Sequence, residues 1–234
     1  MGKFVSEMEA HLLVSIIIPC KKIDDYVRRC VSECEKLPQE KEIIVITDEI
    51  CPGFPAGKRN WAMQRAKGEV FAFIDSDAYP AKDWLEKALF YLRCFDAVCG
   101  PGVLPPDSPR NEKIADQVHK WVFCPYRVTA RNARIVPWHP TFNLITRAEV
   151  APRFDNYLTG EDDRFCAGIP GGIFYHPEIL VYHNRRGIFR PLWKQFGTYA
   201  RHKGTFKALA LVAFVTTIFT YAVNFVKGFL RRRP

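Results

Sequence analysis

Short apolar runs alternate with segments of helical spacing over residues 14–100. The clearest run, Val70–Ile74, holds five apolar residues in succession and lies between Gly68 and Tyr79-Pro80. Such an unbroken run is typical of a strand buried on both faces of a parallel sheet. Because strands and helices alternate, we predict an α/β fold with a mostly parallel, Rossmann-like sheet flanked by helices. The other strands predicted here span 14–19, 43–46 and 97–100, and the helices span 24–37, 58–66 and 81–95.

The pattern is less regular beyond residue 101, where prolines recur as far as residue 140. We predict a helix over 111–123, strands over 142–146 and 172–182, and a helix that begins within 160–166. This last helix opens with three successive acids, which the positive end of a helix dipole favours.

The most informative polar residues, Asp75-Ser76-Asp77, directly follow the buried run. A chain that leaves a parallel strand emerges at the carboxyl edge of the sheet, where open α/β sheets bind ligands. Two carboxylates at this spacing can hold Mg²⁺ or Mn²⁺ beside a phosphate and can reach a ribose hydroxyl. A solvated acidic turn could have the same sequence, so the other motifs must distinguish a binding site from such a turn. Dinucleotide binding is disfavoured, because Pro19-Cys20 rather than a glycine-rich loop follows the first strand.

The net charge of +9 is concentrated at the end of the chain. Residues 179–234 hold eleven Lys and Arg and no Asp or Glu, so the preceding residues carry 23 basic against 25 acidic side chains. This balance excludes nucleic-acid binding by the body of the chain before residue 179 on grounds of charge. We place the main domain at residues 1–204 and an appended segment at 205–234.

Residues 208–226 form an uncharged run of 19 residues, which as a helix is long enough to span a bilayer core of about 30 Å. Its apolar residues lie all round such a helix, which argues against a surface helix and predicts a membrane segment. A core helix, a re-entrant helix or a deep interfacial helix is the alternative. Cations flank both ends, so charge alone does not orient it.

The cysteines and the N-terminal residues bear on the compartment. Eight cysteines without a signal peptide in residues 1–11 or paired C-x2-C units favour reduced thiols over disulfides or zinc. We therefore expect a membrane-associated protein whose main domain faces the cytoplasm.

Seven short motifs follow one another along the chain. They are V-S-I-I-I-P at 14–19, E-I-I-V at 42–45 ending at Asp48, A-G-K-R-N at 56–60, D-S-D at 75–77, N-L-I-T-R at 143–147, G-E-D at 160–162 and V-Y-H-N-R-R at 181–186. In this order they resemble the family-2 inverting glycosyltransferases of the GT-A fold, over residues 14 to about 204. There are departures: Lys21-Lys22 replaces the residue pair usual after the first strand, Thr47 replaces an Asp, and Arg164 replaces an acid.

The resemblance implies a metal-dependent transfer. Asp77 would be a direct ligand of Mn²⁺ or Mg²⁺, and Asp75 would bind the metal, directly or through water, or the ribose. His183 corresponds to the histidine that completes the metal site in many GT-A enzymes. A satisfied structural histidine is the alternative for this residue.

The same resemblance assigns catalytic acids. Asp162 corresponds to the base that deprotonates the acceptor, with Glu161 orienting it or binding the acceptor; Asp163 is the weaker candidate for the base. The alternative is a helix N-terminal acid cluster stabilised only by the dipole.

Donor-binding residues follow from the remaining motifs. Asp48 would read the nucleobase or its ribose, Arg59 would contact base or phosphate, and Pro19 would shape the first loop against the nucleotide. The alternatives are turn formation for Asp48 and a solvated helix face for Arg59. Arg201 would approach the pyrophosphate or, equally, an anionic lipid headgroup.

These assignments together predict a glycosyltransferase that moves a sugar from a nucleotide-sugar, expected to be a UDP-sugar, to a lipid-linked or glycan acceptor at the membrane. Two other functions are consistent with parts of this sequence. One is a sugar-1-phosphate nucleotidyltransferase, which has the same kind of sheet but normally a glycine-rich loop after the first strand. The other is a non-catalytic, membrane-tethered nucleotide-sugar-binding protein, against which Asp75, Asp77 and Asp162 argue.

Overall fold

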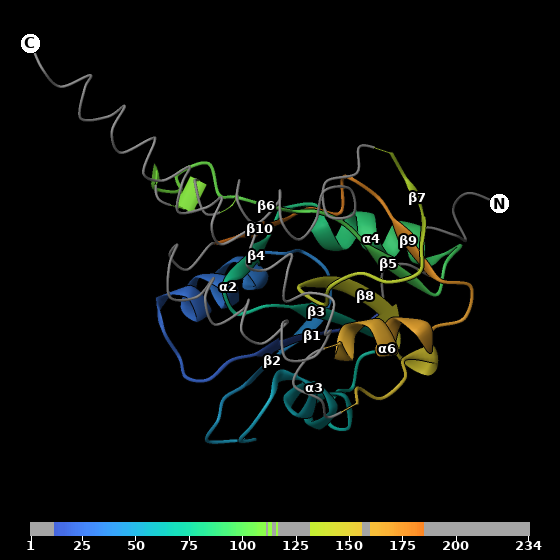
Figure 1. Cartoon of the computed structure of the whole chain (residues 1–234), viewed down its shortest axis with the longest axis horizontal. Coiled ribbons are helices and arrows are strands. Elements are labelled where there is room, and N and C mark those ends of the chain that lie inside the picture. The colour runs from blue at the N-terminus through green and yellow to red at the C-terminus, as the bar shows by residue number, and fades with distance from the viewer. Residues whose placement is uncertain (1–11, 111, 114–115, 117–131, 156–159, 185–234) are drawn as a thin grey trace, which may run out of the picture.

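The computed structural model describes residues 12–110, 112–113, 116, 132–155 and 160–184, and Figure 1 shows their arrangement. The larger sheet has the strand order β2-β1-β3-β8-β5-β9-β7, and the smaller has the order β4-β10-β6. The strands are β1 Val14–Pro19, β2 Lys41–Ile46, β3 Val70–Ile74, β4 Ala78–Pro80, β5 Ala97–Cys99, β6 Gly102–Val103, β7 Arg134–Val136, β8 Asn143–Arg147, β9 Ile173–Tyr175 and β10 Val181–His183. The helices are α2 Asp25–Glu35, α3 Pro55–Met63, α4 Trp84–Leu92, the 3-10 turn η1 Ala148–Val150 and α6 Glu161–Ala167.

Helices cover both faces of the larger sheet, as Figure 1 shows. On one face, Ile16 and Ile18 of β1 belong to a core cluster with residues of α2 and α4. On the other face, Ile17 belongs to a second cluster with residues of α3 and α6. Every residue of β1 and β3 is buried, as the unbroken apolar runs predict.

The predicted mostly parallel sheet is confirmed for β1, β2 and β3, which pair in parallel. The strand β8 is an exception, because it lies antiparallel between β3 and β5. A further antiparallel strand, β7, pairs with β9, which is parallel to β5. Five strands therefore point one way, and β8 and β7 point the other.

Several predicted boundaries are wrong, and α4 Trp84–Leu92 is shorter at both ends than the helix expected over 81–95. The strand expected over 172–182 is two strands, β9 and β10. The chain turns at His176–Leu180, a segment that contains Pro177, and passes there from the larger sheet into the smaller one. The helix expected over 58–66 is α3, which starts at Pro55, a residue well suited to the first turn of a helix. Most of the helix predicted over 111–123 lies outside the described residues.

The segment 208–226 also lies outside the described residues. Within the part of the chain that the structure describes, no helix combines the length and the apolar character that a membrane crossing requires.

Asn143 joins the two sheets from inside the core. Its side chain is fully buried, accepts a bond of 2.8 Å from Trp84 Nε1 on α4 and donates one of 2.7 Å to the carbonyl oxygen of Ile179. The chain approaches so closely here that a Cβ on Gly100 would lie 1.9 Å from that same carbonyl oxygen. Asn143 therefore fixes the turn that carries β10 back towards the end of β3.

We expect Asn143→Leu to cost about 3 kcal/mol of unfolding free energy, because the indole N–H and the Ile179 carbonyl both lose a buried partner. The matched control is Thr146→Val on the same strand, also fully buried, whose lost hydroxyl bond to Asp96 should cost about 1 kcal/mol. Urea unfolding measures both. Equal losses for the two variants would refute the linking role of Asn143.

Candidate active site

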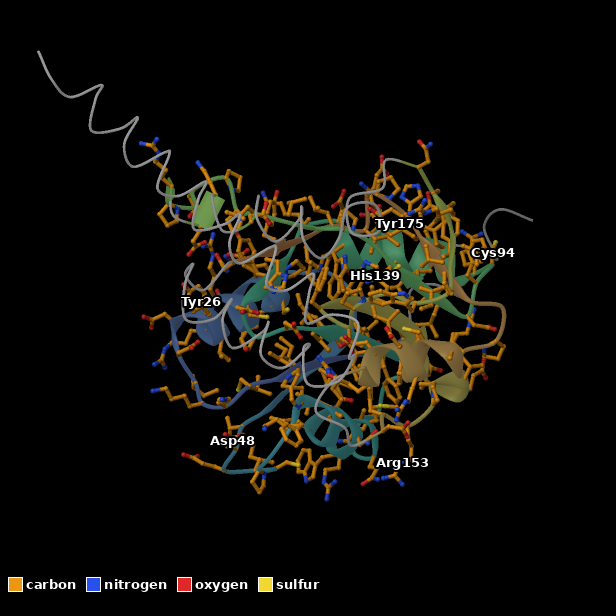
Figure 2. The ribbon with its side chains drawn as sticks, viewed as in Figure 1. Tyr26, Asp48, Cys94, His139, Arg153 and Tyr175 are labelled. Atoms are coloured by element: carbon orange, nitrogen blue, oxygen red, sulfur yellow. The ribbon has the colours of Figure 1, made fainter. Side chains whose placement is uncertain are left out.

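The candidate active site lies at the edge where β1, β2 and β3 end. Pro19 closes β1 and pairs with Ile46, which closes β2. The backbone N–H of Asp48 donates to the carbonyl oxygen of Lys21 at 3.0 Å, so the loops after the two strands are joined. Figure 2 shows Asp48 on the loop that follows β2. Parallel strands thus bring the predicted donor-binding loops to one edge.

Asp75, Asp77 and His183 converge beside this edge. Each offers one ligand atom, and these atoms lie within 4.8 Å of one another. His183 Nε2 is 3.2 Å from Asp77 Oδ1. The antiparallel pairing of β10 with β4 sets His183 opposite Ala78, the residue after Asp77.

The turn that carries the two aspartates is held by backbone bonds. The N–H of Ala78 donates to the Asp75 carbonyl at 2.9 Å. Asn184 donates to the Asp77 carbonyl both from its backbone N–H and from its side-chain Nδ2, each at 2.9 Å. The positions of the two carboxylates therefore depend on the smaller sheet as well as on β3.

The chemistry of this donor set fits a divalent cation. Two carboxylates supply hard oxygen ligands, and the imidazole adds a nitrogen, a combination that suits manganese. His183 Nδ1 is buried and has no hydrogen-bond partner among the described residues. The His183 ring also packs on Phe142, with centroids 4.8 Å apart, which fixes its plane.

A second group of acids enters from α6. The helix follows Gly160, whose φ of 82° is a left-handed conformation that glycine adopts without strain. Asp162 Oδ1 accepts a bond of 2.7 Å from the hydroxyl of Thr141, a residue that is 1% exposed. The Thr141 hydroxyl therefore fixes Oδ1, one of the two carboxylate oxygens of Asp162.

Burial raises the pKa of Asp162, although the Arg59 charge and the Thr141 bond act in the opposite direction. Burial also raises the pKa of Glu161, and the neighbouring Asp162 charge adds to the rise. A carboxylate whose pKa is raised towards neutrality is a stronger base when ionised, which suits proton abstraction.

Arg59 joins the two groups of acids. Its side chain is 5% exposed, and its Nη2 donates to Asp75 Oδ1 at 3.1 Å. Its Nη1 lies 3.8 Å from Glu161 Oε1 and 4.0 Å from Asp162 Oδ1. The structure thus brings together Asp75, Arg59, Glu161 and Asp162, four residues that come from α3, the end of β3 and α6.

Sequence reasoning missed three residues around the site. Lys58 is 3% exposed and binds Asp48 Oδ1 at 2.5 Å, although a lysine in an amphipathic helix normally indicates a solvated face. Thr141 carries no motif at all. The ring centroids of His139 and Tyr175 of β9 are 6.1 Å apart, and Figure 2 labels both residues. Burial lowers the pKa of His139 to about 4, so it is neutral at physiological pH.

Other predicted site residues stand apart or outside the structure. Asp48 and Pro19 share the edge with the acids, but Asp48 pairs with Lys58 rather than with the group around Arg59. Arg201 lies outside the described residues.

Residues 53–150 match the family described as glycosyl transferase family 2. This span includes Arg59, Asp75, Asp77 and Thr141 but ends before α6 and His183. No curated protein matches the sequence.

Solved structures resemble the chain at low sequence identity. Staphylococcus aureus TarS 1–349 in complex with UDP-GlcNAc has 18% identity and a TM-score of 0.56, over 75% of this chain and 59% of that one. The same protein with UDP has 17% identity and a TM-score of 0.54, over 86% and 65%. The mannosyltransferase PcManGT from Pyrobaculum calidifontis, with GDP-Man and Mn²⁺, has 16% identity and a TM-score of 0.51, over 90% and 75%.

At such identities the likeness shows the fold, which is that of GT-A proteins. The chain spans about 59–65% of the length of these TarS structures. The family match over residues 53–150 is consistent with the resemblance in the motifs, and the neighbours show the fold alone.

The raised pKa of Asp162 predicts a stability effect. The folded state holds this proton more tightly than the unfolded chain, whose aspartates titrate near pH 3.9, so stability is lost as pH rises through the folded pKa. Asp162→Asn removes the partly buried charge and keeps an oxygen to accept the Thr141 bond. We therefore expect the variant to be more stable than the wild type at pH 7, with the gain shrinking as pH falls.

Denaturant unfolding between pH 4 and pH 8 measures this difference. Asp163→Asn is the control, because it removes one charge from the same first turn of α6. Losing that charge's interaction with the helix dipole should lower the unfolding free energy by about 0.3 kcal/mol. If Asp162→Asn lowers the unfolding free energy at pH 7 as much as Asp163→Asn does, the burial of the Asp162 charge does not destabilise the protein.

Proposed function

We propose that this protein is a metal-dependent inverting glycosyltransferase. It would move a sugar from a nucleotide-sugar to a membrane-associated, lipid-linked or glycan acceptor. The observation that carries the proposal is the convergence of Asp75, Asp77 and His183 with Glu161 and Asp162 on either side of Arg59. One group suits a cation on a diphosphate, and the other suits a base for a hydroxyl.

Each of the two clusters of residues suits one part of the sugar transfer. A bound Mn²⁺ or Mg²⁺ would neutralise charge on the diphosphate and on the departing nucleotide. Asp75, Asp77 and His183 would hold that ion, and the imidazole nitrogen favours Mn²⁺ because Mg²⁺ prefers an all-oxygen shell. Asp75 would also be in reach of the ribose.

Asp162 would act as the base. Its oxygen Oδ2 would take the proton of the acceptor hydroxyl as the hydroxyl oxygen forms a bond to the anomeric carbon and the carbon–oxygen bond to the diphosphate breaks. Attack from the face opposite the diphosphate inverts the configuration. Thr141 holds the other oxygen at 2.7 Å, and Glu161 would orient the acceptor.

A UDP-sugar is the proposed donor. Support comes from the TarS structures, which hold UDP-GlcNAc and UDP. Pro19 and Asp48 would line the nucleoside end, because both lie where β1 and β2 end. Arg201 would approach the pyrophosphate or a lipid headgroup.

The membrane association of the acceptor rests on the sequence. The uncharged run 208–226 would embed in the bilayer, with the catalytic domain, residues 1–204, on the cytoplasmic side. An acceptor carried on a lipid would then reach the site without leaving the membrane surface.

Donor binding and turnover separate the roles of the acids. In a panel of nucleotide-sugars with Mn²⁺, a true donor at 100 times its dissociation constant should add about 2.7 kcal/mol of stability, and EDTA should abolish both this gain and transfer. Asp162→Asn should keep donor affinity and lose about 10²-fold or more in turnover. Asp77→Ala should lose donor affinity as well.

Asp163→Asn is the matched control for Asp162→Asn and should retain most turnover. Transfer that survives exhaustive chelation would overturn the metal dependence. A dead Asp163→Asn protein beside an active Asp162→Asn protein would show that the base is the neighbouring residue.

The tail can be tested by extraction. Apolar burial is not screened by salt, whereas exposed charges are screened beyond about 8 Å at physiological ionic strength. We expect the full-length chain to resist high salt and alkaline carbonate and to need detergent. A chain truncated after Gly204 should stay folded and bind nucleotide without the membrane. Release of the full-length chain in the salt wash would disprove membrane embedding by 208–226.

A further inference from the structure

Arg59 lies near three carboxylates but forms a hydrogen bond with only one of them. Its Nη2 bonds Asp75 Oδ1 at 3.1 Å, whereas its Nη1 stops 3.8 Å from Glu161 Oε1 and 4.0 Å from Asp162 Oδ1. Nη1 and Nε are both buried and have no hydrogen-bond partner among the described residues. An arginine with two unused buried donors is in an incomplete arrangement, because such groups are normally bonded.

Arg59 and a divalent cation would compete for the carboxylate of Asp75. Its carboxylate is one of three groups whose ligand atoms lie within 4.8 Å of one another, and it is also the partner that Arg59 bonds. A divalent cation held by Asp75 would bring two positive charges close to the guanidinium. In a partly buried site, this repulsion is only weakly screened by solvent.

The acids of α6 are the alternative partners. A shift of less than 1 Å in Nη1 would turn the separation of 3.8 Å from Glu161 into a hydrogen bond. Glu161 and Asp162 also need a cation, because burial and their mutual proximity raise the pKa of Glu161. The Phe154 ring, 5.4 Å from the guanidinium carbon, contacts the side chain from another direction and limits where it can go.

We propose that Arg59 is a positioning residue that exchanges partners: it holds Asp75 while the cation site is empty and passes to Glu161 and Asp162 when a divalent cation takes Asp75. The inference rests on the proposed cation site. In this exchange, cation binding by Asp75 and the orientation of Glu161 and Asp162 are coupled. The acids would thus be held in place only when the cation that the donor needs is present.

The coupling predicts that Arg59 opposes cation binding. Removing it should free Asp75, so Arg59→Met should bind Mn²⁺ about tenfold more tightly than the wild type in the absence of nucleotide. Calorimetry or Mn²⁺ electron paramagnetic resonance on the full-length protein in detergent measures the affinity. Arg65→Met is the matched control, because Arg65 is exposed, stacks on Trp61 at 4.0 Å and should leave the affinity unchanged.

The competing view is that Arg59 stays on Asp75 and merely orients it for the metal. Arg59→Met would then bind Mn²⁺ with equal or lower affinity, and either result overturns the exchange. A wild-type protein that binds no Mn²⁺ would refute the cation site itself, and with it this inference. The two failures are therefore distinguishable.

A second measurement follows Arg59 in the wild-type protein itself. Magnesium is diamagnetic, so the side-chain N–H signals of Arg59 can be followed by nuclear magnetic resonance as Mg²⁺ is added to wild-type protein. The Arg59→Lys protein, which lacks these signals, identifies them. Signals that shift on saturation and show new proximity to Glu161 support the exchange, and unchanged signals at saturating Mg²⁺ overturn it.

Discussion

A buried positive charge requires a negative partner, and α3 brings two such charges to one edge of the sheet. Lys58 binds the carboxylate that follows β2, and Arg59 binds the carboxylate that follows β3. Because these cations are consecutive in one helix turn, the two strand ends are held at a fixed spacing relative to α3. The same Arg59 allows the acids of α6 to approach Asp75, which without a cation they would repel. The geometry of the whole site depends on this one charge.

Much of the sheet could be predicted from apolar runs, because strands buried on both faces leave an unmistakable pattern. The structure places β1 at Val14–Pro19 and β3 at Val70–Ile74, as the sequence predicts. Strand direction was not predictable. The strand β8, Asn143–Arg147, carries no local signal that it lies antiparallel between β3 and β5. The turn after Tyr175 was missed for a similar reason, because apolar residues continue beyond Pro177 and mask the change of sheet.

The site was predictable in part. Asp75 and Asp77 follow from their position after a buried strand, and the structure brings His183 to them through the pairing of β10 with β4. The roles of these residues remain predictions. Thr141 could not have been found, because its bond to Asp162 joins residues 21 positions apart that share no periodicity. Lys58 was overlooked because burial of a lysine depends on a partner in another loop.

The attachment of Asn184 has a mechanical consequence. Its two hydrogen bonds end on a single oxygen, the carbonyl of Asp77. The polypeptide beyond residue 184 therefore starts from a point fastened to the turn that carries Asp75 and Asp77. A force transmitted along that part of the chain would load these two bonds and the short strand β10 before it reached the deeply buried strands β1 and β3. In a protein pulled from this end, the turn would yield first, while the hydrophobic layers of the larger sheet stayed intact.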